Sequence, residues 1–162
     1  AGVRTVCVGK IAALFGGAGG DEEIKTAGNA DGIQKTLDAI RAATEADVPT
    51  FIWTNLVDFD ELFGHRNDPT GYAAALEEVD AALPAFEAAL PDGAVLLLTA
   101  DHGNDPTYPG TDHTRERVPI LLFRKGETAG QDLGTAGTFA DHAARVAGHF
   151  GRSAHRPGEN RG

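Results

Sequence analysis

The stretch AVLLLTADHGND (Ala94 to Asp105) decides the fold, because an apolar run passes directly into acid, histidine and glycine. Residues 94–100 are apolar at both alternating sets of positions, which is typical of a strand buried on both faces of a parallel sheet. A turn, Pro91 to Gly93, comes before it. In open sheets of this kind ligands bind beyond the carboxyl ends of the strands. We therefore expect the residues from Asp101 onward to border a site.

Outward from this strand, apolar runs alternate with helical patterns. Further strands are predicted at 3–11, 49–57 and 118–123, and helices at 29–45, 68–90 and 138–150. Asp68 followed by Pro69 is a helix start signal, an N-cap acid before proline at the first helical position. The glycine-rich stretch FGGAGGDEE (15–23) is predicted to be a loop. This order predicts an α/β fold with a mostly parallel sheet flanked by helices on both faces, and no second domain.

Composition narrows the function classes. The net charge of −10 argues against nucleic acid as the main partner, because phosphate backbones are bound by Lys and Arg. No apolar run reaches the ~18 residues that a membrane span needs. The single cysteine, Cys7, is predicted to fill a core position in a strand, and its isolation fits a reducing cytoplasm. The chain starts at Ala1 without any methionine, which both a removed initiator and a fragment would explain.

Acids and histidines gather in three segments at or after the predicted strand ends. These segments are NLVDFDELFGH (55–65), TADHGND (99–105) and PGTDHTRE (109–116). Carboxylate oxygen and imidazole nitrogen together suit Mn²⁺, Zn²⁺ or Fe²⁺, and the absence of thiolates argues against a structural zinc site. Donors from three loops exceed the needs of one tetrahedral ion. The pattern therefore favours two metals, an arrangement typical of phosphoryl transfer.

Each histidine alone has an ordinary structural interpretation. Asp101-His102-Gly103 contains good turn residues, and His65 and His113 could be surface loop residues. The remaining histidines are predicted to lie on the surface; they are His142, His149 and His155. The metal-site interpretation depends on the combination, because three separate loops each supply an acid together with a histidine.

The same residues carry a resemblance to a known family. Asp60 with His65, then Asp101-His102-Gly103, then His113, resemble the metal-ligand series of the alkaline phosphatase superfamily. Longer strings are similar to phosphopentomutases: VGKIAALF (8–15), NLVDFDELFGHRNDPTGYAAALEEVDAALP (55–84), LLLTADHGNDPTYPGTDHTRERVPILLF (96–123) and LGTAGTFADHAARVAGHFG (133–151). The resemblance covers residues 3–151. It implies an alkaline-phosphatase-like core over residues 1–151 and a polar tail over 152–162.

The resemblance also implies roles for single residues. Three of the implied metal ligands would bind one Mn²⁺, namely Asp60, His65 and His113. Asp101 and His102 would bind the second. Lys10 matches a lysine that lies near the substrate phosphate in the family.

In the family a phosphorylated threonine is the nucleophile, and the substrate is a pentose phosphate, (deoxy)ribose 1-phosphate or 5-phosphate. No threonine here matches the nucleophile's motif; Thr54, Thr99 and Thr111 are better explained as strand-end and loop residues. The family's N-terminal segment, which carries that threonine, and its cap domain have no counterpart in this sequence. We therefore expect this chain to be a C-terminal part that needs the missing N-terminal part, and to have little or no activity alone.

Two other classes stay open. Another member of the superfamily, a cofactor-independent phosphoglycerate mutase or a phosphatase, would carry the same metal ligands. A non-catalytic metal-binding module would keep the ligands without the nucleophile. We expect a cytoplasmic protein in every case, with neither nucleic acid nor a membrane as partner.

Overall fold

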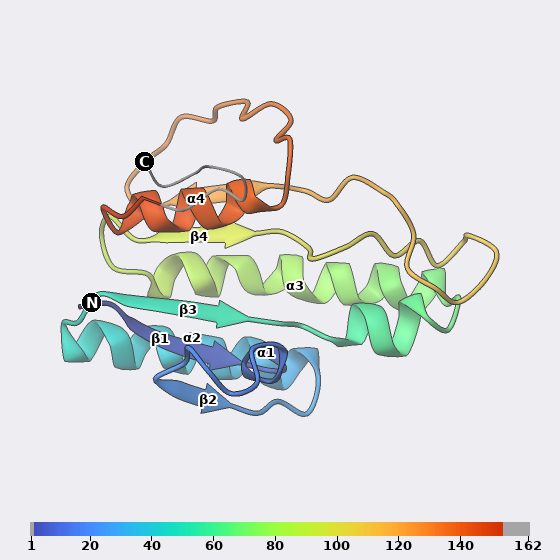
Figure 1. Ribbon diagram of the computed structural model, residues 1–162, viewed down its shortest axis with the longest axis horizontal. Coiled ribbons are helices and arrows are strands. Elements are labelled where there is room, and N and C mark those ends of the chain that lie inside the picture. Colours follow the sequence, from blue (N-terminus) through green and yellow to red (C-terminus); the bar gives the residue numbers. More distant parts are fainter. Residues whose placement is uncertain (1, 154–162) are drawn as a thin grey trace, which may run out of the picture. The chain divides into compact units, whose positions relative to one another are not determined.

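The computed structural model describes residues 2–153, which divide after Glu127 into two compact units (Figure 1). The elements of the first unit follow in the order β1 (Arg4–Val8), α1 (Ile11–Leu14), β2 (Glu22–Ile24), α2 (Asn29–Ala46), β3 (Thr50–Thr54), the π-helix η1 (Phe59–Gly64), α3 (Pro69–Ala89), β4 (Val95–Leu98) and β5 (Leu121–Arg124). The second unit contains α4 (Ala140–His149). Every strand and helix predicted from the apolar spacing is present, with ends that differ by a few residues.

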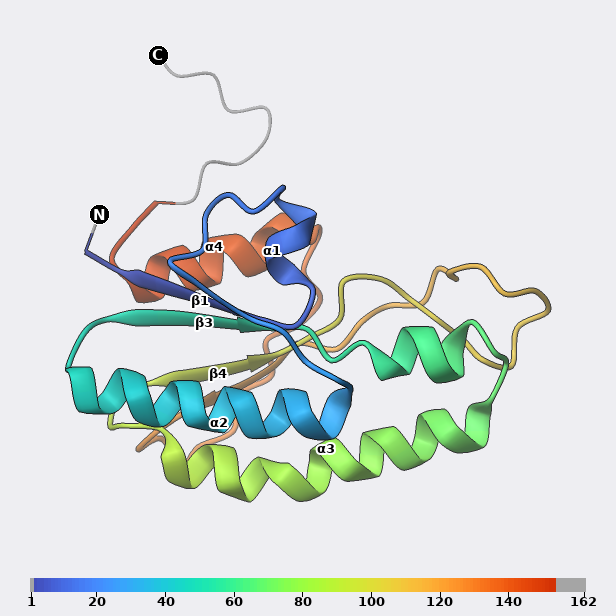
Figure 2. The ribbon, with the colours of Figure 1, turned by 90° about the horizontal axis from the view of Figure 1, so that it is seen from below.

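A parallel sheet with the order β2-β1-β3 forms the centre of the first unit. Successive side chains of β1 point to opposite faces. Val6 and Val8 pack against Ala39 of α2, whereas Cys7 packs with Ile11 and Ala12 of α1. The two helices therefore cover opposite faces of β1, as Figure 2 shows. The predicted α/β architecture is confirmed, and so is the core position of Cys7, whose thiol pKa is raised by burial and then by nearby Glu23.

The edge strand β2 lies partly within the stretch that we predicted to be a loop, so that prediction is wrong at residues 22 and 23. Glu22 and Glu23 have low intrinsic preference for strands. They are extended here because they pair with Val6 and Cys7 of β1, and because the Glu22 carboxylate binds the Arg4 guanidinium at 2.5 Å. Tertiary pairing therefore overrides the local preference.

The strands β4 and β5 form a separate antiparallel pair, which departs from a uniformly parallel arrangement. Leu96 faces Phe123 and Leu98 faces Leu121 in this pair. The connection between them, residues 99–120, contains no helix. A parallel return needs a crossover, usually helical, whereas a loop can bring the chain back antiparallel. The same long loop carries two of the three segments with candidate metal ligands.

The main hydrophobic core lies between α2 and α3. Its buried side chains are Ile33, Leu37, Ile40 and Phe86. The start of α3 follows the predicted signal, because Asp68 Oδ1 accepts a hydrogen bond of 2.9 Å from the Gly71 amide and Pro69 opens the helix. This core fixes the positions of the strand ends from which the site loops leave.

The second unit confirms the helix predicted at 138–150. His149 is exposed and His142 is half-buried. The surface prediction for His155 and most of the predicted polar tail fall outside the described residues. Among the described residues, every helix is too short or too polar to serve as a membrane span.

Candidate metal centre

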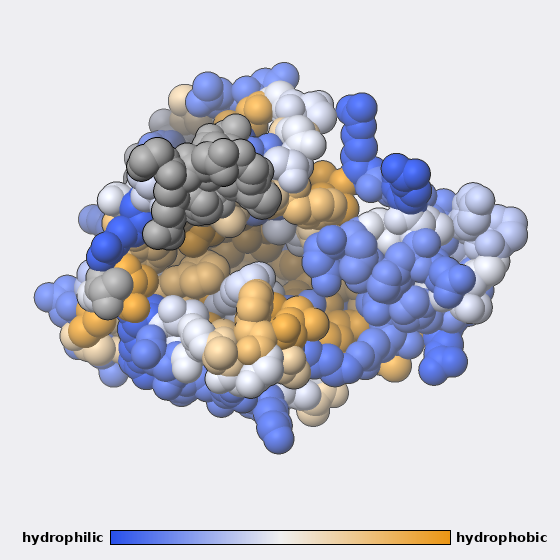
Figure 3. Space-filling view, viewed as in Figure 1, coloured by the Kyte–Doolittle hydropathy of each residue, from blue (hydrophilic) through white to orange (hydrophobic). Residues whose placement is uncertain are grey.

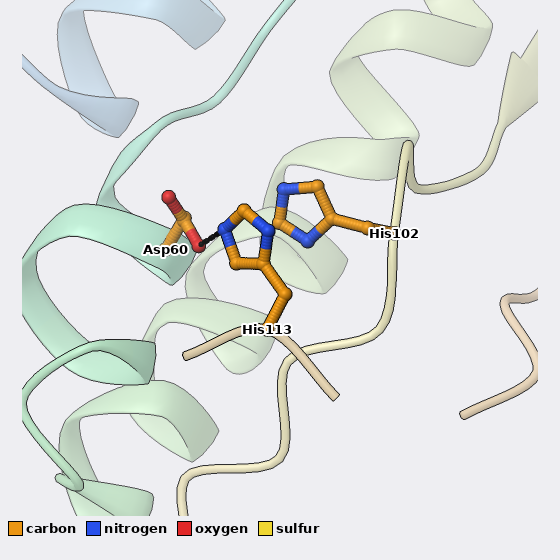
Figure 4. A group of neighbouring side chains, drawn as sticks. All are labelled: Asp60, His102 and His113. Carbon is orange, nitrogen blue, oxygen red and sulfur yellow. Dashed lines mark ion pairs between the residues drawn. The ribbon is translucent and has the colours of Figure 1, made fainter. Parts of the chain in front are cut away.

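Three of the predicted ligands, each from a different segment, meet at one end of the first unit. They are Asp60 in η1, His102 after β4, and His113 in the loop before β5. One potential ligand atom of each lies within 4.8 Å of the others. Figure 4 shows the two imidazole rings beside each other with the Asp60 carboxylate next to His113. This end of the unit, at the right of Figure 3, is covered mainly by hydrophilic side chains.

The Asp60 carboxylate lies at the centre of the group. Its Oδ2 is 3.2 Å from His65 Nε2, and its Oδ1 is 3.3 Å from His113 Nε2. The His65 and His113 rings are stacked with centroids 4.9 Å apart, and those of His102 and His113 are 3.6 Å apart. A single carboxylate thus faces a layer of stacked imidazoles.

Backbone carbonyls lie against the opposite ring nitrogens. His65 Nδ1 lies against the Thr111 carbonyl oxygen, and His102 Nδ1 is 3.2 Å from the Gly103 carbonyl oxygen. A carbonyl only accepts, so each Nδ1 must donate its hydrogen, which leaves the neutral ring a lone pair at Nε2. In that tautomer the His65 Nε2 and the Asp60 carboxylate would repel each other unless a proton or a cation lies between them. Imidazole nitrogen and carboxylate oxygen are donors that suit Mn²⁺, Zn²⁺ or Fe²⁺, so the residues fit a divalent metal.

Asp101 and Lys10 lie less centrally than the other predicted residues. The Asp101 side chain is 67% exposed, and its Oδ1 is 3.6 Å from His102 Nε2. Lys10, at the carboxyl end of β1, forms an ion pair with Glu61 in η1. Five of the six predicted site residues lie in the three segments, and the sixth, Lys10, is bonded to one of them. The compact cluster contains three of the six: Asp60, His102 and His113.

Comparisons with known proteins fit this geometry. The profile of the metalloenzyme superfamily matches residues 3–154. The chain belongs to this superfamily. It is 54% identical over 151 residues to a phosphopentomutase of Anaeromyxobacter sp. (strain K), covering 93% of this chain and 38% of that relative. It is 49% identical over 158 residues to a phosphopentomutase of Deinococcus radiodurans, covering 98% of this chain and 39% of the relative.

A phosphopentomutase of Desulfitobacterium hafniense is 47% identical over 150 residues, with 93% of this chain and 38% of the relative covered. The chain thus spans less than two fifths of the length of these curated relatives. Membership of a metalloenzyme superfamily indicates that the chain binds a divalent metal. The cluster of Asp60, His102 and His113 is the candidate site for it.

The π-helix that carries Asp60 is held by contacts with the start of α2. The Asn29 amide donates to Asp58 Oδ2 at 2.7 Å, and Asn29 Oδ1 accepts from the Asp58 amide at 3.1 Å. The hydrogen bond from the His65 amide to the Asp60 carbonyl, at 2.9 Å, spans five residues and gives the π-turn. The π-turn places the Asp60 and His65 side chains on the same side of the helix.

Two asparagines contact the site and were missed by the sequence analysis. Asn104 Nδ2 donates to Asp60 Oδ1 at 2.5 Å, and Asn67 bonds to the loop that carries His113. The sequence holds a signal for both, because the tetrapeptide NDPT occurs twice, at 67–70 and at 104–107. Asn67 contacts the loop that carries His113, and Asn104 contacts Asp60 in the π-helix. A repeated turn motif beside two candidate ligands could therefore have identified them.

Two ionisable groups near the site have displaced pKa values. The Asp105 carboxylate accepts hydrogen bonds from the Thr107 hydroxyl and amide, at 2.7 and 2.8 Å, and these lower its pKa. Burial raises the pKa of the Tyr72 phenol, and the Asp60 charge raises it further. Asp105 therefore stays ionised and holds its turn through the neutral range, and Tyr72 stays neutral beside Asp60.

Replacement of Gly64 by alanine should disturb the Asp60 carboxylate indirectly. A Cβ at Gly64 would overlap the Asn104 side-chain amide, which donates to Asp60. We expect Mn²⁺ affinity to fall about 10-fold, as for other outer-shell changes, and the free energy of unfolding to fall by about 1–3 kcal/mol from overpacking. Calorimetric titration with Mn²⁺ and denaturant unfolding measure the two effects.

Gly148→Ala in α4 is the matched control, because a Cβ there meets open space. It should lower neither the Mn²⁺ affinity nor the free energy of unfolding. Unchanged Mn²⁺ affinity in Gly64→Ala would show that Asn104 does not support the carboxylate.

Proposed function

We propose that this chain is the metal-binding C-terminal part of a phosphopentomutase, which interconverts (deoxy)ribose 1-phosphate and (deoxy)ribose 5-phosphate. One observation carries the proposal: Asp60, His102 and His113 converge from three segments in a chain about half identical to proteins named phosphopentomutase. The convergence supports a metal-dependent reaction, and the identity over nearly the whole chain supports this particular one.

We propose that the centre holds two divalent metals, Mn²⁺ in the first instance. Asp60, His65 and His113 would hold one of them, since both histidines direct Nε2 at the carboxylate. Asp101 and His102 would contribute to the second. When bound, such ions offset the negative charge of a transferring phosphoryl group and orient its oxygens. The stacking of His102 on His113 fits two metal positions next to each other.

Lys10 is the chain's own cation for the substrate phosphate in this proposal. It lies at the carboxyl end of β1, where ligands of parallel sheets bind. In the described structure its ammonium pairs with the Glu61 carboxylate, and both side chains are about half exposed. An exposed ion pair of this kind contributes little free energy, so a doubly charged phosphate can displace Glu61 from it at small cost.

The nucleophile is proposed to be a phosphorylated threonine outside this chain. It gives its phosphoryl group to one hydroxyl of the sugar phosphate and then receives the phosphoryl group from the other end, so the enzyme regains its starting form. Within this chain the Thr54 hydroxyl lies 2.7 Å from that of Thr36, which gives it a structural partner at the end of β3. The reaction is proposed to serve nucleoside catabolism in the cytoplasm.

A second candidate function is that of another superfamily enzyme, a cofactor-independent phosphoglycerate mutase or a phosphatase. The shared metal centre is compatible with it. A non-catalytic metal-binding module is the third. The three differ in the substrate that the full polypeptide converts.

The deciding experiment is the conversion of ribose 1-phosphate to ribose 5-phosphate by the full polypeptide with Mn²⁺. We expect activity, and a loss of at least ~100-fold in Asp101→Ala, because disturbing a catalytic metal removes several kcal/mol of transition-state stabilisation. Asp92→Ala, an exposed acid in the turn before β4, is the matched control and should retain activity. If ribose 1-phosphate stays untouched while phosphoglycerate or a simple phosphate ester reacts, the second candidate is correct. If none reacts although Mn²⁺ binds, the third is.

A further inference from the structure

Asn67 makes an unusual set of contacts directly after the π-helix segment. Its side-chain nitrogen lies 2.8 Å from the Gly110 carbonyl oxygen, 3.2 Å from that of Tyr108 and 3.4 Å from that of Pro106. An amide nitrogen has two hydrogens, so these three acceptors share two donors, with Gly110 bound most closely. A single side chain thus contacts the backbone of a loop some 40 residues away at three points.

Both ends of this connection belong to the metal centre. Asn67 follows His65 by two residues, and its own amide donates to the Gly64 carbonyl at 3.1 Å. Gly110 comes three residues before His113. The contacts therefore tie the turn that carries Asp60 and His65 to the loop that carries His113.

The loop has few other means of being held. Its residues from Thr107 to His113 are all exposed, and Tyr108 is 59% exposed, so apolar packing contributes little. The Gly103–Thr114 bridge fixes the base of the loop, and the Thr111 carbonyl lies against His65. Thr107 and Tyr108 bond back to Asp105 within the loop, whereas the contacts of Asn67 tie residues 106–110 to the segment that carries Asp60.

The backbone explains why an asparagine occurs at this position. Asn67 has φ of 53°, in the left-handed region that non-glycine residues seldom adopt and that asparagine tolerates best. Among the described residues, the other non-glycine residue with positive φ is Asp47, which ends α2 and lies in no site segment. Glycine would satisfy the backbone at residue 67 equally well but would offer no donor to the loop.

We propose that Asn67 is a positioning residue of the metal centre, whose amide holds the loop at 106–110 so that His113 stays in reach of Asp60. This inference rests on the proposed roles of Asp60 and His113 as metal ligands. Asn67 itself touches neither metal nor substrate in this scheme.

The test compares Mn²⁺ binding to the full polypeptide and two variants by calorimetric titration. Asn67→Gly keeps the left-handed backbone and removes the donors, and we expect about 10- to 100-fold weaker binding, as for other outer-shell partners. Its thermal midpoint should change little, because relief of the left-handed backbone cost offsets the loss of exposed hydrogen bonds. Asn67→Asp keeps shape and backbone but places an acceptor against three carbonyls, and its Mn²⁺ binding should be at least as weak. Wild-type affinity in Asn67→Gly would overturn the proposal.

A matched control and a metal-free readout separate this inference from the metal assignment. Asp47→Gly makes the corresponding backbone change away from the site and should bind Mn²⁺ like the wild type. In metal-free protein, the hydrogen-bonded loop amides of Thr107, Tyr108 and Thr114 should exchange hydrogen faster in Asn67→Gly than in the wild type. Unchanged exchange would overturn the proposed positioning whatever the metal does. If exchange is faster in Asn67→Gly but the wild-type protein binds no Mn²⁺, the metal assignment is refuted instead.

Discussion

Replacing Asp60 by asparagine is expected to lower the proposed mutase activity of the full polypeptide by at least ~1,000-fold. The carboxylate is the one group that His65 Nε2, His113 Nε2 and Asn104 Nδ2 all approach, at 3.2, 3.3 and 2.5 Å. Asparagine keeps the shape but removes the negative charge that a divalent cation requires, and its amide NH₂ would face one of these partners as a donor. Steady-state rates with ribose 1-phosphate at saturating Mn²⁺ measure the loss.

Asp92→Asn is the control for this change, because it removes the same charge from an exposed turn of the same unit. It should leave the rate within about a factor of two, as is usual for surface substitutions away from a site. If high Mn²⁺ restores the Asp60→Asn rate fully, the carboxylate supplies affinity alone. A rate equal to the wild type at all Mn²⁺ concentrations would remove Asp60 from the proposed centre.

Regular apolar spacing accounts for most of the fold that could be predicted. The apolar runs at β1 and β3, the amphipathic α2 and the Asp68–Pro69 helix start carry local signals strong enough to place each element. The edge strand β2 carries none, because two of its three residues are glutamates and its conformation is set by pairing with β1. The antiparallel direction of β5 could not be predicted either, because the composition of a strand does not determine whether its neighbour runs parallel or antiparallel to it.

The candidate site could be predicted as a set of residues but only partly as an arrangement. Strand ends followed by acid and histidine predict that Asp60, His102 and His113 share one edge, and they do. The course of the loop between Asn104 and His113 could not be predicted, because it depends on hydrogen bonds to Asn67 across some 40 residues. Side-chain amides that bind distant carbonyls leave no periodic pattern. Their trace here is the repeated tetrapeptide NDPT.

Truncation of Phe86 to alanine is expected to lower the free energy of unfolding by about 3–5 kcal/mol, the range for buried phenylalanine. Phe86 lies on α3 at 6% exposure and packs against Ile33, Leu37 and Ile40 of α2. The change removes buried apolar surface and leaves a cavity between α2 and α3. Such a loss is a large fraction of the 5–15 kcal/mol typical of a domain. Leu76→Ala on the same helix, at 53% exposure, should cost under about 0.5 kcal/mol. Denaturant unfolding measures both, and equal midpoints for the two variants would show that the α2–α3 contact does not carry the core.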